Sequence, residues 1–416
     1  MTANATEGVP VRAVTWQGKH DVRVETVPDP TIQHDTDAVI RVTSTAICGS
    51  DLHLYDIFGP FLKPGDVLGH ETMGVVEAVG SQAGQRLKVG DRVVVPFNIS
   101  CGTCWMCTHG LQSQCETTQV TQHGTGAALF GYTELYGEVP GGQAEYLRVP
   151  QAQYGPIVVP HEGPDEQYLY LSDILPTAWQ GVAYAATGDR SLEKNPVEGN
   201  TVVVLGLGPV GQLCVRVARL QGAARVIAVD RVTERLALAA EWGAEVVDQG
   251  SVDDVVETLL KLTGGRGPDA VIDAVGMEAH GSPVAKAAQT AAGMLPKAVA
   301  QPLFTHAGVD RLDALHTALR SVRRGGTVSL VGVYGGAMDP VPMLTMFDRQ
   351  VTVRMGQCNV RRWTDAIMPC VTSEDDVLGL SHLATHRLPL SSAPAAYAMF
   401  QQKSDGCIKV VLDPAA

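Results

Sequence analysis

Four cysteines lie close together in segment 101–115, which reads CGTCWMCTHGLQSQC. Two, two and seven residues separate Cys101, Cys104, Cys107 and Cys115, and thiolates at such spacings can converge on one tetrahedral zinc ion. An iron–sulfur cluster also takes four cysteines, and disulfides or unrelated buried thiols are the remaining interpretations. A zinc ion enclosed by four thiolates has no open position, so we expect it to stabilise a lobe while the chemistry takes place elsewhere.

A second metal site is indicated by Cys48, in CGSDLH, and by His70, in GHETMG. A catalytic zinc typically takes three protein ligands and keeps one position open for water or substrate. Alone, Cys48 could be a buried thiol and His70 a core or surface histidine. Their combination with nearby acidic residues favours a metal.

A glycine-rich turn follows a strand-like run and opens a helix-like pattern, which is the context that a dinucleotide-binding turn requires. It contains Gly206, Gly208, Pro209, Val210 and Gly211. The first glycine makes the tight turn, the second lets a pyrophosphate approach the backbone, and the third lets helix and strand pack closely. The amino end of the helix then faces the phosphates. A turn of this kind that binds nothing is the alternative.

Asp230 ends the next predicted strand, 24 residues after Gly206, where a carboxylate accepts hydrogen bonds from ribose hydroxyls. Because this carboxylate repels a 2′-phosphate, it favours NAD over NADP. Arg231 and Arg235 argue for NADP, since cations here can hold that phosphate, although they could also begin a solvated helix. We expect NAD, with Arg235 among the cofactor contacts.

The elements that must position these residues change in character near Pro176. Before it, short runs such as AVIRVTSTAIC and GDRVVVPF predict a β-rich lobe with few helices. After it, strand-like and helix-like segments alternate from TVVVLGLG to TVSLVGVYGG, which predicts a parallel sheet with helices on its faces. Segment 277–308 interrupts this series and reads as an insertion.

Composition limits the classes of function. The 416 residues carry a formal net charge of −13, which argues against unspecific binding to nucleic acid or to anionic membranes. The amino-terminal segment lacks the basic and apolar regions of a signal peptide, and no apolar run reaches the roughly 18 residues that span a bilayer. We therefore expect a cytoplasmic protein whose cysteines are metal ligands or free thiols.

Together these motifs resemble the zinc-dependent medium-chain alcohol dehydrogenases. The resemblance runs through CGSDLH, GHETMGVVEAVG, VGDRVVVPF, the four-cysteine lobe, GQAEYLRVP and GLGPVG. It implies an α/β fold joined to a β-rich, GroES-like catalytic domain, and a homo-oligomer, either a dimer or a tetramer. The implied domains are a catalytic domain at 1–176 with a zinc lobe near 98–116, a NAD-binding Rossmann domain at 177–350 with an insertion near 277–308, and a return to the catalytic domain at 351–416.

The chain departs from the commonest family pattern at the third ligand of the catalytic zinc. That ligand is usually a cysteine just before the Rossmann domain, but no cysteine lies between Cys115 and Cys214, and the segment LSDILPTAWQGV places Asp173 there. This aspartate, with GGQAEY, DAVGMEAHG and the insertion that follows, resembles the branch of glutathione-independent formaldehyde dehydrogenase and formaldehyde dismutase. A helix cap or a surface acid is the alternative for Asp173.

The resemblance implies a role for each residue around the catalytic zinc. Cys48, His70 and Asp173 would hold the metal, and Glu71 resembles a residue that can approach it in some states. Asp51 resembles the acid that orients the zinc-bound histidine.

A proton relay and several cofactor contacts are implied as well. Ser50 and His53 would carry a proton to solvent, Thr177 would contact the nicotinamide side of the cofactor, and Lys409 the pyrophosphate. The remaining expected cofactor contacts are Arg235, Val275 and Val333.

We therefore expect an oxidoreductase that transfers a hydride between NAD and a small alcohol or a hydrated aldehyde of the formaldehyde type. The alternatives are an alcohol dehydrogenase with a larger substrate, a formaldehyde dismutase that keeps NAD bound, and a non-catalytic NAD-binding protein on the same fold. Candidates for the walls of the substrate pocket, each of which could simply be core, are Phe61, Phe130, Trp179 and Met343.

Overall fold

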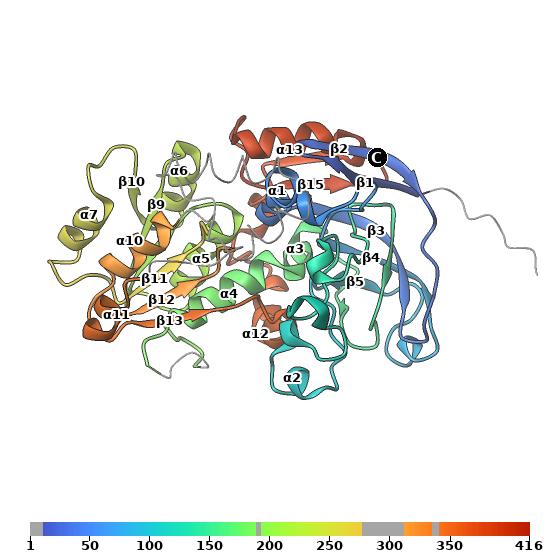
Figure 1. The fold of residues 1–416 in the computed structure, drawn as a ribbon, viewed down its shortest axis with the longest axis horizontal. Helices are drawn as coiled ribbons and strands as arrows, with labels where there is room; N and C mark the ends of the chain where they lie inside the picture. The colour runs from blue at the N-terminus through green and yellow to red at the C-terminus, as the bar shows by residue number, and fades with distance from the viewer. Residues whose placement is uncertain (1–10, 189–192, 277–311, 335–340) are drawn as a thin grey trace, which may run out of the picture. The chain divides into compact units, whose positions relative to one another are not determined.

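The computed structural model describes residues 11–188, 193–276, 312–334 and 341–416 (Figure 1). The predicted insertion near 277–308 lies outside these residues. The chain divides into two compact units. The first contains Met1–Asp173, Asn359–Asp365 and Leu380–Ala416, and the second contains Ile174–Cys358 and Ala366–Gly379.

The first unit is built on a mixed seven-stranded sheet with strand order β14-β15-β3-β4-β5-β7, and β6 pairs with β3 outside this path. A separate antiparallel hairpin precedes it, formed by β1 (Val11–Gly18) and β2 (Asp21–Val27). The strands of the sheet are β3 (Ala38–Ile47), β4 (Glu71–Val79), β5 (Arg92–Val95), β6 (Tyr146–Val149), β7 (Ile157–Val158), β14 (His386–Pro389) and β15 (Val410–Asp413).

One core cluster of this unit lies on a face of the sheet, where side chains such as Ile40, Val42, Val76 and Val93 pack together. Short strands predominate in this unit, as the sequence predicts, and its α-helices are few. They are α1 (Gly49–Asp56), α2 (Trp105–Thr108), α3 (Glu166–Leu169) and α13 (Ala393–Gln402), together with the 3-10 turns η1 (Gly59–Phe61), η2 (Ala83–Gln85), η3 (Gln112–Gln114), η4 (Thr121–His123), η5 (Glu134–Tyr136), η6 (Tyr170–Ser172), η8 (Leu380–His382) and η9 (Leu390–Ser392).

The second unit contains a six-stranded sheet of order β10-β9-β8-β11-β12-β13, in which every pairing is parallel. The predicted alternation of strands and helices is thereby confirmed. The strands are β8 (Thr201–Leu205), β9 (Arg225–Asp230), β10 (Glu245–Asp248), β11 (Ala270–Asp273), β12 (Thr327–Leu330) and β13 (Thr352–Met355). The helices are α4 (Ile174–Tyr184), α5 (Pro209–Leu220), α6 (Thr233–Glu241), α7 (Val255–Leu262), α10 (Asp313–Ser321) and α11 (Met343–Arg349), while α12 (Val360–Val371) carries residues of both units.

Burial on both faces explains why β8 and β11 read as continuous apolar runs. Val203 and Val271 face the same cluster as Leu259 of α7 and Leu315 of α10, so these two helices cover one face. The domain boundaries differ from the expected ones after Gln350, because β13 pairs in parallel with β12 and belongs to the second unit.

Among the described residues, no helix combines the length and the apolar character that crossing a bilayer would need.

Candidate active site

Neighbouring strand ends bring the predicted metal ligands together. Ala46 of β3 lies opposite Glu71 of β4, and Ile47 lies opposite Val410 of β15. The residues just outside these pairs are Cys48 and His70, so the pairing of three strands places them side by side. Asp173 follows the 3-10 turn η6, which is tied to this place by a hydrogen bond from the Phe97 N–H to the carbonyl of Ser172 (3.0 Å).

Cys48, His70, Glu71 and Asp173 are all buried, and one ligand atom from each lies within 4.8 Å of the others. The Cys48 Sγ and the His70 Nε2 lie 3.5 Å and 3.3 Å from Asp173 Oδ2. The structure therefore brings together the three predicted ligands and Glu71. Their zinc-binding role stays a prediction.

The cluster concentrates acidic groups away from water. Burial and the charges of Asp173 and Glu71 raise the pKa of Cys48 to about 11. Burial also raises the pKa of Glu71, against the pull of Lys409, and Glu71 Oε2 is buried without a hydrogen bond. A divalent cation would stabilise the thiolate and both carboxylates at once, and one thiolate, one imidazole and one carboxylate are all ligands that zinc accepts. The donor set therefore fits zinc.

Asp51 stands behind His70 and is fully buried. Its Oδ1 lies 3.1 Å from His70 Nδ1, within hydrogen-bonding distance, and its Oδ2 accepts the N–H of Cys48 at 2.9 Å. Burial lowers the pKa of His70, but the charge of Asp51 and a bond to Asp173 raise it well above the usual range. With Nδ1 facing Asp51, His70 presents Nε2 to the cluster, which is the orientation a zinc ligand needs.

Ser50 and His53, the predicted proton relay, lie on the same short helix α1. The half-buried Ser50 places its Oγ 3.1 Å from His70 Nε2, on the side of the ligand atoms. His53 is buried, and its ring lies edge-on to Phe58 at 6.2 Å. Ser50 thus borders the cluster, while the contact of His53 is with Phe58, and the relay itself stays a prediction.

Lys409 lies in a different environment from the one expected of a pyrophosphate ligand. Its side chain and that of Glu71 are both fully buried and form an ion pair, and Nζ also donates to the carbonyl of Ile47 at 3.0 Å. The expected pyrophosphate contact stays a prediction. In the structure, the ammonium group of Lys409 contacts Glu71 and Ile47, which belong to the first unit.

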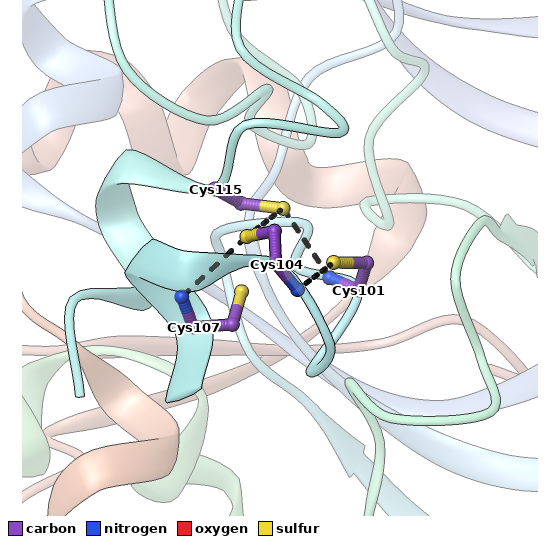
Figure 2. A group of neighbouring side chains, drawn as sticks. All are labelled: Cys101, Cys104, Cys107 and Cys115. Carbon is purple, nitrogen blue, oxygen red and sulfur yellow. Dashed lines mark hydrogen bonds between the residues drawn. The ribbon is translucent and has the colours of Figure 1, made fainter. Parts of the chain in front are cut away.

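The four cysteines of segment 101–115 form a compact cluster (Figure 2). Cys101 donates its N–H to Cys115 Sγ (3.4 Å), and Cys104 donates its N–H to Cys101 Sγ (3.4 Å). Burial opposes ionisation of Cys101, but hydrogen bonds from Thr117 and the backbone lower its pKa to about 6. All nine cysteines are free, which removes the disulfide interpretation. A cluster of four thiols whose sulfurs accept N–H bonds could hold a structural zinc.

The glycine turn at the start of α5 has the close packing that its motif predicts. Gly206 has a φ of +83°, and a Cβ there would lie 2.6 Å from Val275 Cγ2. A Cβ on Gly211 would lie 1.9 Å from the Gly206 carbonyl oxygen. Asp230 ends β9 and accepts the N–H of Leu207 at 2.6 Å, so the strand end and the turn are held together.

The other predicted cofactor residues, apart from Lys409, belong to the second unit. Arg235 is buried, and a Cβ built on Gly208 would lie 3.9 Å from its Nη1. Val275 is half-buried after β11, Val333 is 38% exposed after β12, and the half-buried Thr177 lies on α4. Their contacts with a cofactor stay predictions.

The candidates for pocket walls are only partly supported. Phe130 belongs to a core cluster of the first unit, and Phe61 is 2% exposed, with its ring edge-on to that of Phe58 at 6.2 Å. Met343 is 65% exposed on α11, so its apolar side chain is neither core nor enclosed within its unit. Trp179 is half-buried on α4.

Three residues near the cluster were not predicted from the sequence. Tyr132 follows Gly131, where a Cβ would lie 2.5 Å from the backbone of Gly69, so the loop packs against the residue before His70. Burial raises the pKa of Tyr132 above its usual range. Gln143 and Tyr397 are fully buried behind Asp51. The motif GGQAEY was a signal for Gln143, but nothing in the sequence linked it to residue 397.

Comparison with known proteins places this geometry in a family. Residues 34–160 match the alcohol dehydrogenase GroES-like domain, and residues 209–295 match the zinc-binding dehydrogenase family. An uncharacterised zinc-type alcohol dehydrogenase-like protein of Bacillus subtilis, AdhB, is 41% identical over 407 residues, which cover 97% of this chain and all of that one.

Two further relatives are named for formaldehyde. Formaldehyde dismutase of Pseudomonas putida is 33% identical over an alignment that covers 97% of both chains. Glutathione-independent formaldehyde dehydrogenase of Pseudomonas aeruginosa is 37% identical over 281 residues, which cover 65% of this chain and 66% of that one.

Solved structures agree in fold. Alcohol dehydrogenase TADH from Thermus sp. ATN1 superposes with a TM-score of 0.79 at 34% identity, covering 97% of this chain and 99% of its own. A putative zinc-binding dehydrogenase from Sinorhizobium meliloti bound to NADP has a TM-score of 0.71 at 26% identity, covering 98% and 100% of the two chains. This chain is therefore an oxidoreductase of the zinc-dependent medium-chain alcohol dehydrogenase family.

Proposed function

We propose that this oxidoreductase uses NAD to oxidise a small primary alcohol or a hydrated aldehyde of the formaldehyde type. The observation that carries the proposal is the buried set of Cys48, His70 and Asp173, with their ligand atoms within 4.8 Å of one another. Bound zinc would supply the positive charge that lowers the pKa of a substrate hydroxyl, and NAD would accept the hydride.

The protein's own residues supply geometry and a path for the proton. With Asp51 Oδ1 3.1 Å from Nδ1 of His70, a proton on Nδ1 would be stabilised and Nε2 would be available to the metal. Ser50, 3.1 Å from that Nε2, is placed to accept a proton from the substrate hydroxyl, and His53 would pass it on towards solvent.

Tyr132 offers a hydrogen-bond donor for a second substrate oxygen. Its pKa is raised, mainly by burial, and the charges of Asp51 and Cys48 contribute to the shift, so the phenol stays protonated next to the cluster. A hydrated aldehyde carries two hydroxyl groups on one carbon. While one is held by the metal, the other could accept from Tyr132, and loss of hydride from that carbon would give a carboxylic acid.

NAD is proposed over NADP because of Asp230. Its carboxylate is held at the end of β9 by the N–H groups of Leu207, Arg231 and Val232 (2.6, 2.6 and 3.0 Å). These contacts fix the carboxylate at the end of the strand, and its negative charge would repel a 2′-phosphate.

Mixing the purified protein with formaldehyde, with and without added NAD⁺, tests the proposal. A dehydrogenase produces formate and NADH in equal amounts and only with added NAD⁺. Formate and methanol in equal amounts without added cofactor would identify a dismutase that keeps NAD bound. Neither product in either mixture would refute formaldehyde as a substrate.

An alcohol dehydrogenase with a larger substrate is the second candidate, and the likeness to an alcohol dehydrogenase from Thermus at 34% identity supports an alcohol as the substrate class. A panel of primary and secondary alcohols, followed by NADH absorbance, separates the two. A higher kcat/KM for a long-chain alcohol than for formaldehyde would select this alternative.

The expected homo-oligomer remains part of the proposal. On α11, Met343, Leu344 and Phe347 are 65%, 80% and 84% exposed, and exposed apolar groups of this kind often mark protein contacts. Light scattering on the native protein and on L344D would show whether this helix takes part.

A further inference from the structure

A chain of buried polar contacts, two of them hydrogen bonds, runs from the carboxy-terminal segment to the predicted metal ligand His70. The hydroxyl of Tyr397, on α13, donates to Gln143 Oε1 at 2.8 Å. The amide of Gln143 donates to Asp51 Oδ2 at 3.2 Å, and Asp51 Oδ1 lies 3.1 Å from His70 Nδ1. None of these four side chains is more than 4% exposed.

The side-chain amide of Gln143 fits its surroundings in only one of its two orientations. Its NH₂ group faces two acceptors, Asp51 Oδ2 and the carbonyl oxygen of Ala46, both at 3.2 Å. Its carbonyl oxygen accepts from the phenol of Tyr397, and burial raises the pKa of that phenol well above its usual range, so the proton that it donates is retained. A flipped amide would set oxygen against both acceptors, and a buried mismatch of this kind is costly.

The backbone around Gln143 is shaped to admit this side chain. Gly69 has a φ of +97°, and a Cβ there would lie 2.4 Å from Gln143 Cγ. Since Gly69 directly precedes His70, the space for Gln143 and the position of the histidine come from the same stretch of backbone.

We propose that Gln143 and Tyr397 are positioning residues for the metal site, which hold Asp51 so that His70 keeps Nε2 directed at the metal. Asp51 has to serve Cys48 and His70 with two oxygens. The amide of Gln143 fixes the plane of that carboxylate, and the hydrogen bond from Tyr397 fixes the orientation of the amide.

The test measures release of zinc from the intact zinc-loaded protein to a chromophoric chelator. Outer-shell partners of metal ligands typically contribute 10- to 100-fold to metal affinity. We expect Q143M to release the catalytic zinc about tenfold faster than the unmodified protein. Y397F should release it about fivefold faster, which is the factor that corresponds to the loss of one buried hydrogen bond.

The four-cysteine lobe serves as a control within each protein, because its zinc should leave at an unchanged rate. The release phase of the lobe is identified with C107S, which removes one of its thiols. Y55F is the matched control, since the ring of Tyr55 lies 5.4 Å from that of Tyr397 but its hydroxyl is not part of the chain. It should leave both release phases unchanged.

Q143E separates positioning from space filling, because glutamate has the shape of glutamine but sets an oxygen against Asp51. We expect it to release the catalytic zinc at least as fast as Q143M. Unchanged release from Q143E, unchanged release from Y397F, or equal acceleration of both phases would each overturn the proposal. This readout involves no substrate, so it stands or falls independently of the proposed reaction.

Discussion

The buried ion pair between Lys409 and Glu71 allows a sharp prediction for K409M. Both side chains are fully buried, so the substitution leaves a carboxylate next to Cys48 and Asp173 without its cation. Removing one partner of a buried pair costs about 3–5 kcal/mol. For a unit of this size, that loss corresponds to a fall in Tm of about 10 °C, measured by scanning calorimetry at matched zinc content.

The double variant E71L/K409M should recover most of this loss, because apolar replacement of a whole buried pair is often neutral or stabilising. The pKa of Glu71 is raised by burial and lowered by Lys409, so in K409M it should rise further above the unfolded value. A carboxyl group of this kind takes up a proton on folding, so K409M should regain stability as the pH falls from about 8 towards 5.

The alternative is that Lys409 serves the cofactor, as the family resemblance implies. In that case K409M would raise the KM for NAD while the Tm and the pH dependence of stability stay unchanged. An unchanged Tm, or a double variant no more stable than K409M, would refute the reasoning from the ion pair.

Further predictions concern the cofactor, both metal sites and the substrate. D230S should lower the preference for NAD over NADP at least about tenfold in kcat/KM; an unchanged ratio would contradict the assignment. C107S should lose one of two zinc ions per chain and lower the Tm, and full zinc content would argue against a structural zinc. D173C should shift the pH profile of kcat, since thiolate is a softer ligand than carboxylate; the same profile would count against Asp173 as a ligand. Y132F should lower kcat/KM for formaldehyde about tenfold more than that for ethanol, as expected for one lost hydrogen bond to a second hydroxyl. Equal losses would remove the proposed contact.

The sequence supports the local features of the fold and the site well. Short motifs carry Cys48, His70 and the glycine turn, and the continuous apolar run of β8 predicts a strand buried on both faces. Asp173 could be placed only by resemblance, because a single aspartate before a helix has no spacing that marks it as a ligand.

What the sequence could not supply is contact between distant segments. Lys409 and Glu71 are 338 residues apart, and Tyr397 and Gln143 are 254 apart. Both contacts depend on the pairing of β15 with β3 and on the packing of α13, which follow from the register of the whole sheet. The expected boundary at Gln350 was wrong for a similar reason, since VTVRMG reads as a strand without indicating which sheet it joins.

The central claim is that hydride passes from the carbon of a small alcohol or hydrated aldehyde to NAD. Incubation of the purified zinc-loaded protein with NAD⁺ and fully deuterated formaldehyde, followed by mass spectrometry of the reduced cofactor, tests it directly. The account predicts NADH that carries one deuterium, formed in step with deuterated formate. Reduced cofactor without deuterium, or no turnover of formaldehyde and of a panel of deuterated primary alcohols, would contradict it.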